Sequence, residues 1–182
     1  MTKAWMIACA ATLLLTACDN KDVPAPTSEK AAEGAGDKTL ASGLGDNPKF
    51  AAAIKSAGLD GVLAGPTPYT VLVPNDAAFD KLPAGAIDTL MSPAGRKDLT
   101  AVLTNHILPG TMLAADIGKA IDSGGGKTQI ATLGGGTLTA SRSGESIVLA
   151  DTTGTKAMVI GADGQRSNGV IHRIDAVLMP ST

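Results

Sequence analysis

Two histidines, His106 and His172, have the widest chemical range of any side chains in this 182-residue sequence. His106 could serve as a general base or a metal ligand, with Asp76 as its orienting carboxylate and a serine or threonine hydroxyl as the nucleophile. The sequence has no G-x-S-x-G turn and no second histidine at ligand spacing to complete such a site. Both histidines fall on the apolar face of their segments, so we predict core histidines whose ring nitrogens find hydrogen-bond partners.

Three glycine-containing stretches have a superficial likeness to ligand-binding loops. The run from Ser123 to Thr128 ends in Gly-Lys-Thr like a phosphate-binding loop, but Ile121 stands where that loop needs its first glycine. Residues 151–154 and 161–164 lack the acidic spacing and the downstream glutamate of a calcium loop. We interpret all three as turns, and we predict no catalytic residue, no metal ligand and no cofactor.

The first residues have the pattern of a bacterial lipoprotein leader. Lys3 precedes an apolar run over residues 4–15 that is too short for a stable membrane span. The run ends in Leu-Thr-Ala-Cys, which resembles a lipobox and predicts a signal peptide over 1–17 and acylation of Cys18. The protein would then be attached to a membrane, outside the cytoplasm. Asp19 resembles an inner-membrane retention signal and favours the inner membrane facing the periplasm, with the outer membrane as the alternative.

Composition limits the classes of function. The formal net charge is −2, lysine and arginine do not cluster, and aromatic residues make up only 2% of the chain. A nucleic-acid partner would require a basic surface or stacking rings, so we predict none. Cys9 lies in the predicted leader and Cys18 would carry lipid. The mature chain therefore keeps no thiol for a disulfide, a cysteine metal site or a cysteine nucleophile.

A polar segment separates the predicted leader from the predicted domain. Residues 18–42 are rich in proline, glycine, serine and charge, without apolar periodicity. We predict that they form a disordered tether behind the acylated cysteine. A flexible tether of this length has a typical reach of roughly 25–30 Å. The folded domain is predicted over residues 43–182.

Residues 69–79 combine a strand, a stop and a helix start. Residues 69–73 are β-forming and alternate between two faces. Pro74 cannot donate a ladder hydrogen bond, so the strand ends there. Asn75 and Asp76 can each cap a helix, and Phe79 then points into a core.

Other helices are marked by caps and by apolar stripes. Asn47-Pro48 and Ser92-Pro93 each read as a cap followed by proline at the first helical position. In the second helix Leu99, Val102, Leu103 and His106 share one face. A short helix is also predicted at 85–91, a short helix or turn at 59–63, and a short helical segment or loop at 112–121.

The second half of the chain changes from helical to strand patterns. Short β-forming runs separated by glycine, serine and aspartate turns are predicted at 129–133, 136–140, 146–150, 156–160 and 170–179. The runs at 136–140 and 146–150 read as a hairpin. In the last run the even-numbered residues from 170 to 178 share one face, which includes His172, and the odd-numbered residues from 171 to 179 share the other. Helices first and strands later, without βαβ alternation, predict an α+β domain.

Three ordered segments resemble the signature segments of the fasciclin domain family. Residues 69–79 resemble its first segment and residues 103–110 its central histidine segment. Residues 168–180 resemble its closing segment. The resemblance covers about residues 40–180. It assigns family-signature, structural roles to Thr70, Pro74, Asn75, Asp76, Phe79, His106, Asn168, Gly169 and His172.

The resemblance implies a fold and a function. The family fold is a compact β-sandwich or wedge with several helices packed on one side. The family's usual roles are adhesion and the binding of protein or matrix, without a catalytic cycle. We therefore expect a lipid-anchored, extracytoplasmic binding module whose partner is an unidentified protein or surface polysaccharide.

The sequence departs from the family pattern at one informative position. Many members have tyrosine before the central histidine, a pair tied to integrin-type adhesion in animal members, whereas this chain has Asn105-His106. The departure argues against an integrin-type site. Asp175 matches an acidic position that animal members use in binding. The resemblance thus leaves Asn105, His106 and Asp175 as candidate binding residues.

The same resemblance suggests a structural partner for His106. Carried inward on its helix, the ring could reach the turn at Asn75 and Asp76 and so join the central helix to the strand-to-helix junction. Two alternatives to an adhesive module stay open. One is a structural or regulatory envelope protein without an adhesive partner, and the other is a ligand-binding or enzymatic domain centred on His106.

Overall fold

The structure is a computed structural model that describes residues 38–180. The predicted signal peptide, Cys18, Asp19 and residues 20–37 of the predicted tether lie outside the described residues.

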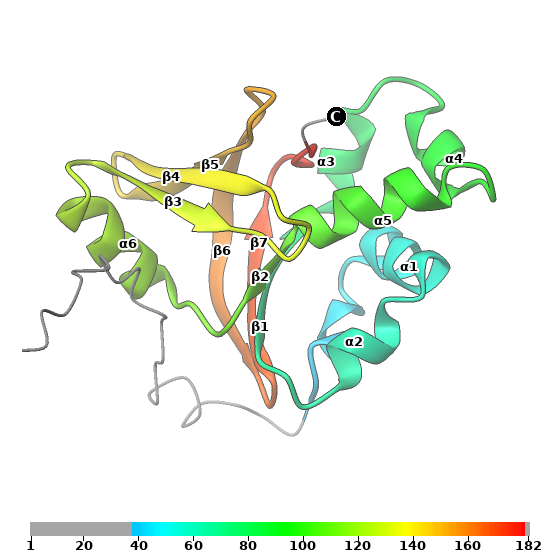
Figure 1. The fold of residues 1–182 in the computed structure, drawn as a ribbon, viewed down its shortest axis with the longest axis horizontal. Helices are drawn as coiled ribbons and strands as arrows, with labels where there is room; N and C mark the ends of the chain where they lie inside the picture. Colours follow the sequence, from blue (N-terminus) through cyan, green and yellow to red (C-terminus); the bar gives the residue numbers. More distant parts are fainter. Residues whose placement is uncertain (1–37, 181–182) are drawn as a thin grey trace, which may run out of the picture.

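A seven-stranded sheet forms the centre of the domain (Figure 1). Its spatial order is β2-β1-β7-β6-β5-β4-β3, and β1 and β7 are parallel whereas the other neighbouring pairs are antiparallel. The strands are β1 (Tyr69–Pro74), β2 (Ile107–Pro109), β3 (Lys127–Ala131), β4 (Thr137–Ser143), β5 (Ser146–Ala150), β6 (Lys156–Arg166) and β7 (Gly169–Ile174).

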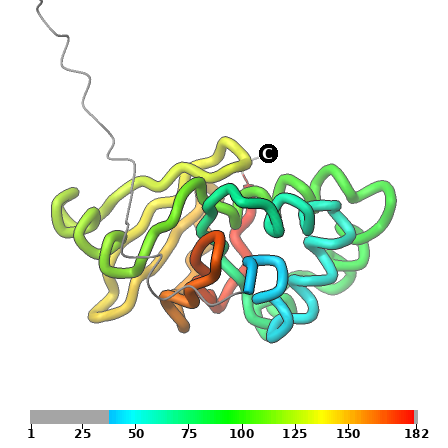
Figure 2. Tube along the Cα trace, turned by 90° about the horizontal axis from the view of Figure 1, so that it is seen from below, coloured from blue at the N-terminus to red at the C-terminus, as the bar shows by residue number. Residues whose placement is uncertain are grey.

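Helices gather mainly beside one end of this sheet. Figures 1 and 2 show α1 to α5 together on one side of the molecule, with α6 at the opposite end near β3 and β4. The predicted α+β class, with helices mainly early and strands mainly late, is confirmed. The helices are η2 (Ala41–Leu44), α1 (Pro48–Ala57), α2 (Asp60–Ala64), α3 (Asp76–Asp80), α4 (Ala86–Met91), α5 (Arg96–Asn105) and α6 (Ala114–Ser123).

The sheet curls until its two edges meet at one end. β2 and β3 are the outermost strands in the spatial order, yet Leu133, just after β3, donates its backbone N–H to the carbonyl of Ile107 in β2 at 2.7 Å. This closure gives the sheet a wedge shape with an interior on each side of β1 and β7.

β1 supplies side chains to two hydrophobic cores, one on each face of the sheet. Val71 and Val73 pack into the core beside α1, α3 and α5, whereas Leu72 belongs to the core that α6 covers. The predicted alternation of this strand is therefore confirmed. β7 divides in the same way, with Ile171 in the first core and Ile174 in the second. A strand buried on both faces is mostly apolar on both, which explains the apolar run from Val71 to Val73 in β1.

The junction after β1 forms as predicted. The strand ends at Pro74, and the Asn75 side-chain oxygen accepts the N–H of Ala78 at 2.8 Å, which caps α3. Asp76 is the first residue of α3 rather than its cap. Phe79 lies in the helix-side core, with 9% of its surface exposed.

Helix α5 begins later than the Ser92-Pro93 pattern predicts. The Ser92 hydroxyl accepts the N–H of Gly95 at 3.1 Å and donates to the Thr89 carbonyl at 2.6 Å, so it closes a short turn between α4 and α5. A Cβ on Gly95 would lie 2.1 Å from the Thr89 carbonyl oxygen. Residues 92–95 therefore form the turn between the two helices, and α5 begins at Arg96.

The last strand is shorter than its alternating sequence predicts. β7 ends at Ile174, but the alternation continues beyond it, because Val177 packs into the helix-side core and Leu178 into the other. The N–H groups of Leu178 and Met179 bond to side chains instead of to a neighbouring strand. The side chains of this segment still alternate between the two cores, although its backbone does not pair with a neighbouring strand.

A buried asparagine joins the beginning of the domain to its last strand. The Asn168 side-chain oxygen accepts the N–H of Leu40 at 2.7 Å, and its amide nitrogen donates to the carbonyls of Leu63 at 2.8 Å and Gly65 at 2.7 Å. Leu40 is fully buried, so the folded part begins a few residues before the predicted boundary at 43.

Gly169 allows β7 to approach β1 at the same point. Its φ angle is 149°, and a Cβ there would lie 1.9 Å from the carbonyl oxygen of Tyr69. Any side chain at this position would push the two central strands apart.

Replacing Asn168 by alanine should destabilise the domain by about 2–4 kcal/mol, because two buried backbone groups and one partly buried carbonyl lose their partners. Urea denaturation of the variant and the wild type measures the difference. Ser167→Ala is the matched control, since Ser167 is the exposed neighbour of Asn168. Equal losses in the two variants would contradict the role assigned to Asn168.

Candidate functional site

His106 lies at the end of α5, inside the domain. The residue is fully buried and follows the last helical residue, Asn105. Its Nε2 lies 3.0 Å from the backbone N–H of Leu178, which can only donate, so Nε2 accepts. Nδ1 then carries the proton and donates to the carbonyl of Val102 at 2.7 Å. The ring also meets Phe50 edge to face, with the ring centroids 6.1 Å apart.

The partner predicted for His106 was wrong. Both ring nitrogens are used by Val102 and Leu178, so the ring joins α5 to the C-terminal segment and not to the turn at Asn75 and Asp76. In residues 38–180 no hydrogen bond joins His106 to Asp76, and Asp76 Oδ1 is buried without a partner. The base-and-carboxylate pair considered from the sequence is therefore not assembled in this structure.

Asp151 completes the attachment of the C-terminal segment, and sequence reasoning missed it. Its Oδ2 accepts the N–H of Met179 at 2.8 Å, next to the N–H that His106 accepts. Its Oδ1 accepts the N–H groups of Thr153 and Thr155, each at 2.9 Å. The sequence Asp-Thr-Thr-Gly-Thr at residues 151–155 could have indicated this role. It is typical of a turn in which the aspartate side chain accepts backbone N–H groups a few residues later.

His172 makes the same kind of link on the other face of the sheet. Its Nδ1 accepts the N–H of Asp163 at 3.2 Å, so its Nε2 donates to the carbonyl of Met112 at 2.8 Å. The prediction of two core histidines with satisfied ring nitrogens is confirmed. Each histidine accepts from one segment and donates to another.

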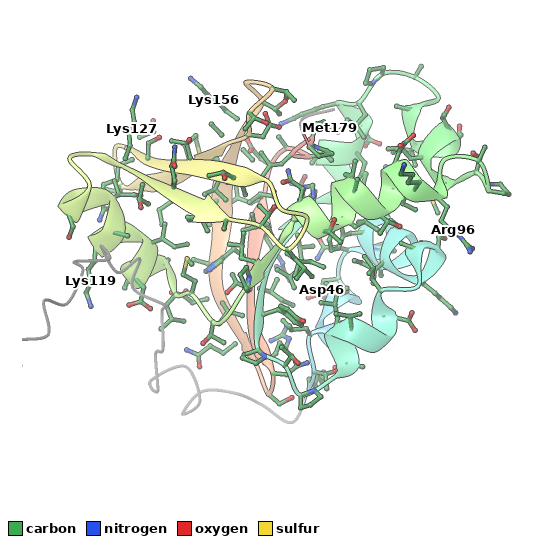
Figure 3. The ribbon with its side chains drawn as sticks, in the orientation of Figure 1. Asp46, Arg96, Lys119, Lys127, Lys156 and Met179 are labelled. Carbon is green, nitrogen blue, oxygen red and sulfur yellow. The ribbon has the colours of Figure 1, made fainter. Side chains whose placement is uncertain are left out.

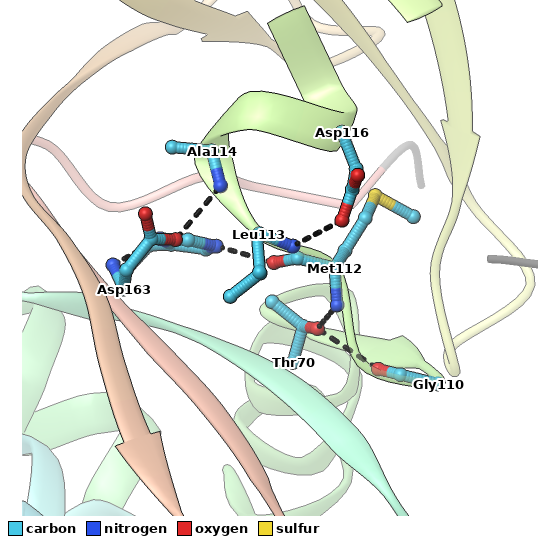
Figure 4. A network of polar contacts seen from close by, with 8 residues as sticks. Thr70, Gly110, Met112, Leu113, Ala114, Asp116 and Asp163 are labelled. Carbon is cyan, nitrogen blue, oxygen red and sulfur yellow. Dashed lines mark hydrogen bonds and ion pairs between the residues drawn. The ribbon is translucent and has the colours of Figure 1, made fainter. Parts of the chain in front are cut away.

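Thr70 extends this network to the segment between β2 and α6 (Figure 4). Its hydroxyl donates to the carbonyl of Gly110 and accepts the N–H of Met112, both at 2.8 Å. Asp163 Oδ1 accepts the N–H of Ala114 at 2.8 Å. Thr70 is buried within a strand, so its hydroxyl needs these partners. The signature threonine therefore has a structural use.

The candidate binding residues lie in different environments. Asn105 is 3% exposed and His106 is fully buried, so neither side chain is presented to a partner. Asn105 Oδ1 accepts the Thr132 hydroxyl at 3.2 Å. Asp175 is at the surface, where its side chain accepts the N–H of Met158 at 2.7 Å and lies 3.8 Å from the ammonium of Lys81.

An apolar cavity of about 390 Å³ lies among α1, α3, α4 and α5. Phe50, Leu103 and His106 form part of its buried wall, and Ala52 and Met91 stand at its exposed side. The sequence predicted that most of these residues face a core but not that the core is hollow. How far four helices stand apart depends on their packing together, which no local pattern contains.

The described residues offer little else from which a metal site, a membrane span or a basic surface could be built. Within residues 38–180 no cluster of three or more His, Cys, Asp or Glu side chains is arranged to hold a metal ion. None of the helices in that range has the length and apolar character that crossing a bilayer requires. The cations labelled in Figure 3 (Arg96, Lys119, Lys127 and Lys156) are spread around the molecule.

Comparisons with known proteins agree on one family. The fasciclin domain model matches residues 45–180. Protein sll1483 of Synechocystis is 38% identical over 129 residues, which are 71% of this chain and 64% of that protein. The pig transforming growth factor-beta-induced protein ig-h3 is 36% identical over 132 residues, 72% of this chain and 17% of that protein.

A solved structure shows the same fold. A FAS1 domain pair from the insect cell adhesion molecule fasciclin I aligns with a TM-score of 0.56 at 23% identity, covering 72% of this chain and 44% of that one.

The mycobacterial immunogenic protein MPB70, from Mycobacterium bovis, is 34% identical over 112 residues, 62% of this chain and 50% of that protein. This chain thus spans only part of each of these relatives.

Burial lowers the pKa of His106 from 6.5 to about 4, and burial also lowers the pKa of His172. A folded-state pKa below the unfolded value means that the unfolded chain binds protons first as the pH falls. The stabilisation by neutral His106 is therefore complete above pH 6.5 and is lost as the pH falls from 6.5 to about 4.

Between pH 7 and pH 4.5, the wild type should lose about 2 kcal/mol more of its unfolding free energy than His106→Gln, which cannot titrate there. Urea denaturation at the two pH values measures this difference. Carboxylates and His172 titrate in both proteins and cancel in the comparison. Parallel pH profiles for the two proteins would show that His106 is not the group responsible.

Proposed function

The chain belongs to the fasciclin domain family, and we propose that it is a lipid-anchored, extracytoplasmic binding module that acts in cell adhesion or in contacts at the cell envelope. Family membership over residues 45–180 is the observation that carries this proposal. A domain of an insect cell adhesion molecule has the same fold, which supports the adhesive version.

The environment of the two histidines supports binding over catalysis. A general base must present a free nitrogen to its substrate, and in both rings one nitrogen accepts a backbone N–H while the other donates to a carbonyl. Because both rings are used in joining segments, neither is free to act on a substrate as a base. On that surface Asp175, paired with Lys81, is the sequence-derived candidate that a protein or surface polysaccharide could reach.

The anchor is proposed from the lipobox-like residues that end at Cys18. The described domain begins twenty residues later, at Lys38. If the residues between them form the predicted tether, a chain of this length would span roughly 25 Å, which is enough to hold the domain clear of a membrane surface. Several acyl chains on one cysteine would make the attachment stable. Asp19 favours the inner membrane facing the periplasm, with the outer membrane as the alternative.

Cells fed a traceable palmitate should incorporate it into the wild type but not into Cys18→Ser, because the proposed acylation needs this thiol. Cys9→Ser is the matched control and should keep the label, since Cys9 lies in the leader. Equal labelling of the wild type and Cys18→Ser would rule out the proposed anchor.

Deletion of the protein should reduce cell attachment and aggregation, and wild-type protein should restore both. The alternative of a structural or regulatory envelope protein predicts unchanged attachment with altered envelope integrity. Scoring attachment together with detergent sensitivity in the deletion strain separates these functions. Normal attachment in cells that lack the protein would exclude the adhesive role.

A further inference from the structure

The cavity among α1, α3, α4 and α5 is open at one side and closed at the other. Its inner wall consists of buried side chains, including Phe50, Val102 and Leu103. Its outer side is formed by residues of α1 and α4, where Ala52 is exposed and Met91 is 39% exposed. A ligand could therefore enter from solvent and reach the interior beside His106.

Helix α4 suggests that the cavity is incompletely filled. It contributes Ile87, Leu90 and Met91 to the lining, yet it has no buried residue. Its C-terminal end is held against α5 by the turn at Ser92 and by the close approach at Gly95. The helix is thus fixed in place with an apolar face that the protein covers only in part, because Ile87 and Leu90 pack against the core yet stay partly exposed.

The chemistry of the wall selects the class of occupant. The lining is almost entirely apolar, and its one interior polar ring, His106, has both nitrogens bonded to the backbone. A peptide entering the cavity would bury N–H and C=O groups without partners, which is costly. An unbranched hydrocarbon chain has no such groups.

The volume fits one chain. An engineered cavity of roughly 150 Å³ holds benzene, with six carbons, so about 390 Å³ scales to roughly fifteen carbons. A two-chain phospholipid would exceed this space. A single chain of about fourteen to sixteen carbons matches it by the same scaling.

The mouth carries a cation. Lys49 is the charged residue among the described residues that line the cavity, and its ammonium contacts the carboxylate of Asp80. The side chains of Lys49 and Asp80 are 41% and 69% exposed, and an ion pair so exposed contributes little. The ammonium can therefore turn to a carboxylate at the end of a bound chain.

We propose that this cavity binds a free long-chain fatty acid, with its hydrocarbon among α1, α4 and α5 and its carboxylate at Lys49. This site is independent of the proposed adhesive role, so the failure of either proposal leaves the other standing. The occupant is a free acid rather than the protein's own anchor, because the site pairs a one-chain volume with a cation at its mouth.

The full chain in membranes can be tested with a photoreactive hexadecanoate, followed by mapping of the labelled peptides. Label should fall on α1, α4 and α5, and excess hexadecanoate should compete it away. Ala52→Trp, at the mouth, should reduce this label at least tenfold. Ala101→Trp, the same change at an exposed position of α5 outside the lining, should leave it unchanged.

Further arms test the carboxylate contact and the other occupants. Lys49→Gln should reduce labelling by the acid severalfold but not labelling by the matching photoreactive alcohol.

Label scattered over the surface, or equal label in Ala52→Trp and the wild type, would overturn the proposal. Cavity label seen only in Cys18→Ser would show the protein's own acyl chain in the cavity. Label seen only after peripheral proteins are stripped from the membranes would show a protein partner there. Either result would overturn the free fatty acid as occupant.

Discussion

The parallel pairing of β1 with β7 is the contact on which the rest of the domain depends. The two strands lie about one hundred residues apart in the chain, so their pairing holds together segments that are distant in sequence. The start of this pairing is tightly constrained. A Cβ at Gly169 would collide with the carbonyl oxygen of Tyr69, and Asn168 bonds to three backbone groups in two other segments, one at Leu40 and one at the end of α2. Once the two strands are paired, their alternating side chains define two cores, and the helices and β3 to β6 cover those cores.

The two buried histidines do related work on opposite faces of this strand pair. Imidazole is suited to it because the neutral ring offers one donor and one acceptor on opposite edges. His106 uses them to fasten the C-terminal segment to α5, and His172 uses them to join β6 to the segment before α6. A lysine could not accept and a carboxylate could not donate, so neither would bridge a carbonyl and an N–H. The ability of the imidazole ring to donate and accept a hydrogen bond at once, which is useful in catalysis, here joins segments of the fold.

The consequence is that the two histidines are enclosed while other candidate sites stay accessible. Asn105 and His106 are enclosed, whereas Asp175 and the apolar mouth beside α4 remain accessible. A fasciclin domain held near a membrane would present both of these features to its surroundings. One is polar and suited to a macromolecular partner, and the other is apolar and suited to a small amphiphile.

The sequence by itself determined the features that depend on neighbours in the chain. The alternation of β1, the stop at Pro74, the Asn75 cap and the apolar stripe of α5 all follow from local geometry, and the family pattern added the fold. Only the tertiary structure decided which distant groups meet: Leu178 rather than the Asn75 turn as the partner of His106, Asp151 at Met179, and a hollow beneath α4. The physical reason is that periodicity specifies which face of an element is buried. Hydrogen-bond partners and unfilled volume depend on how several elements pack at once, and no single stretch of sequence contains that information.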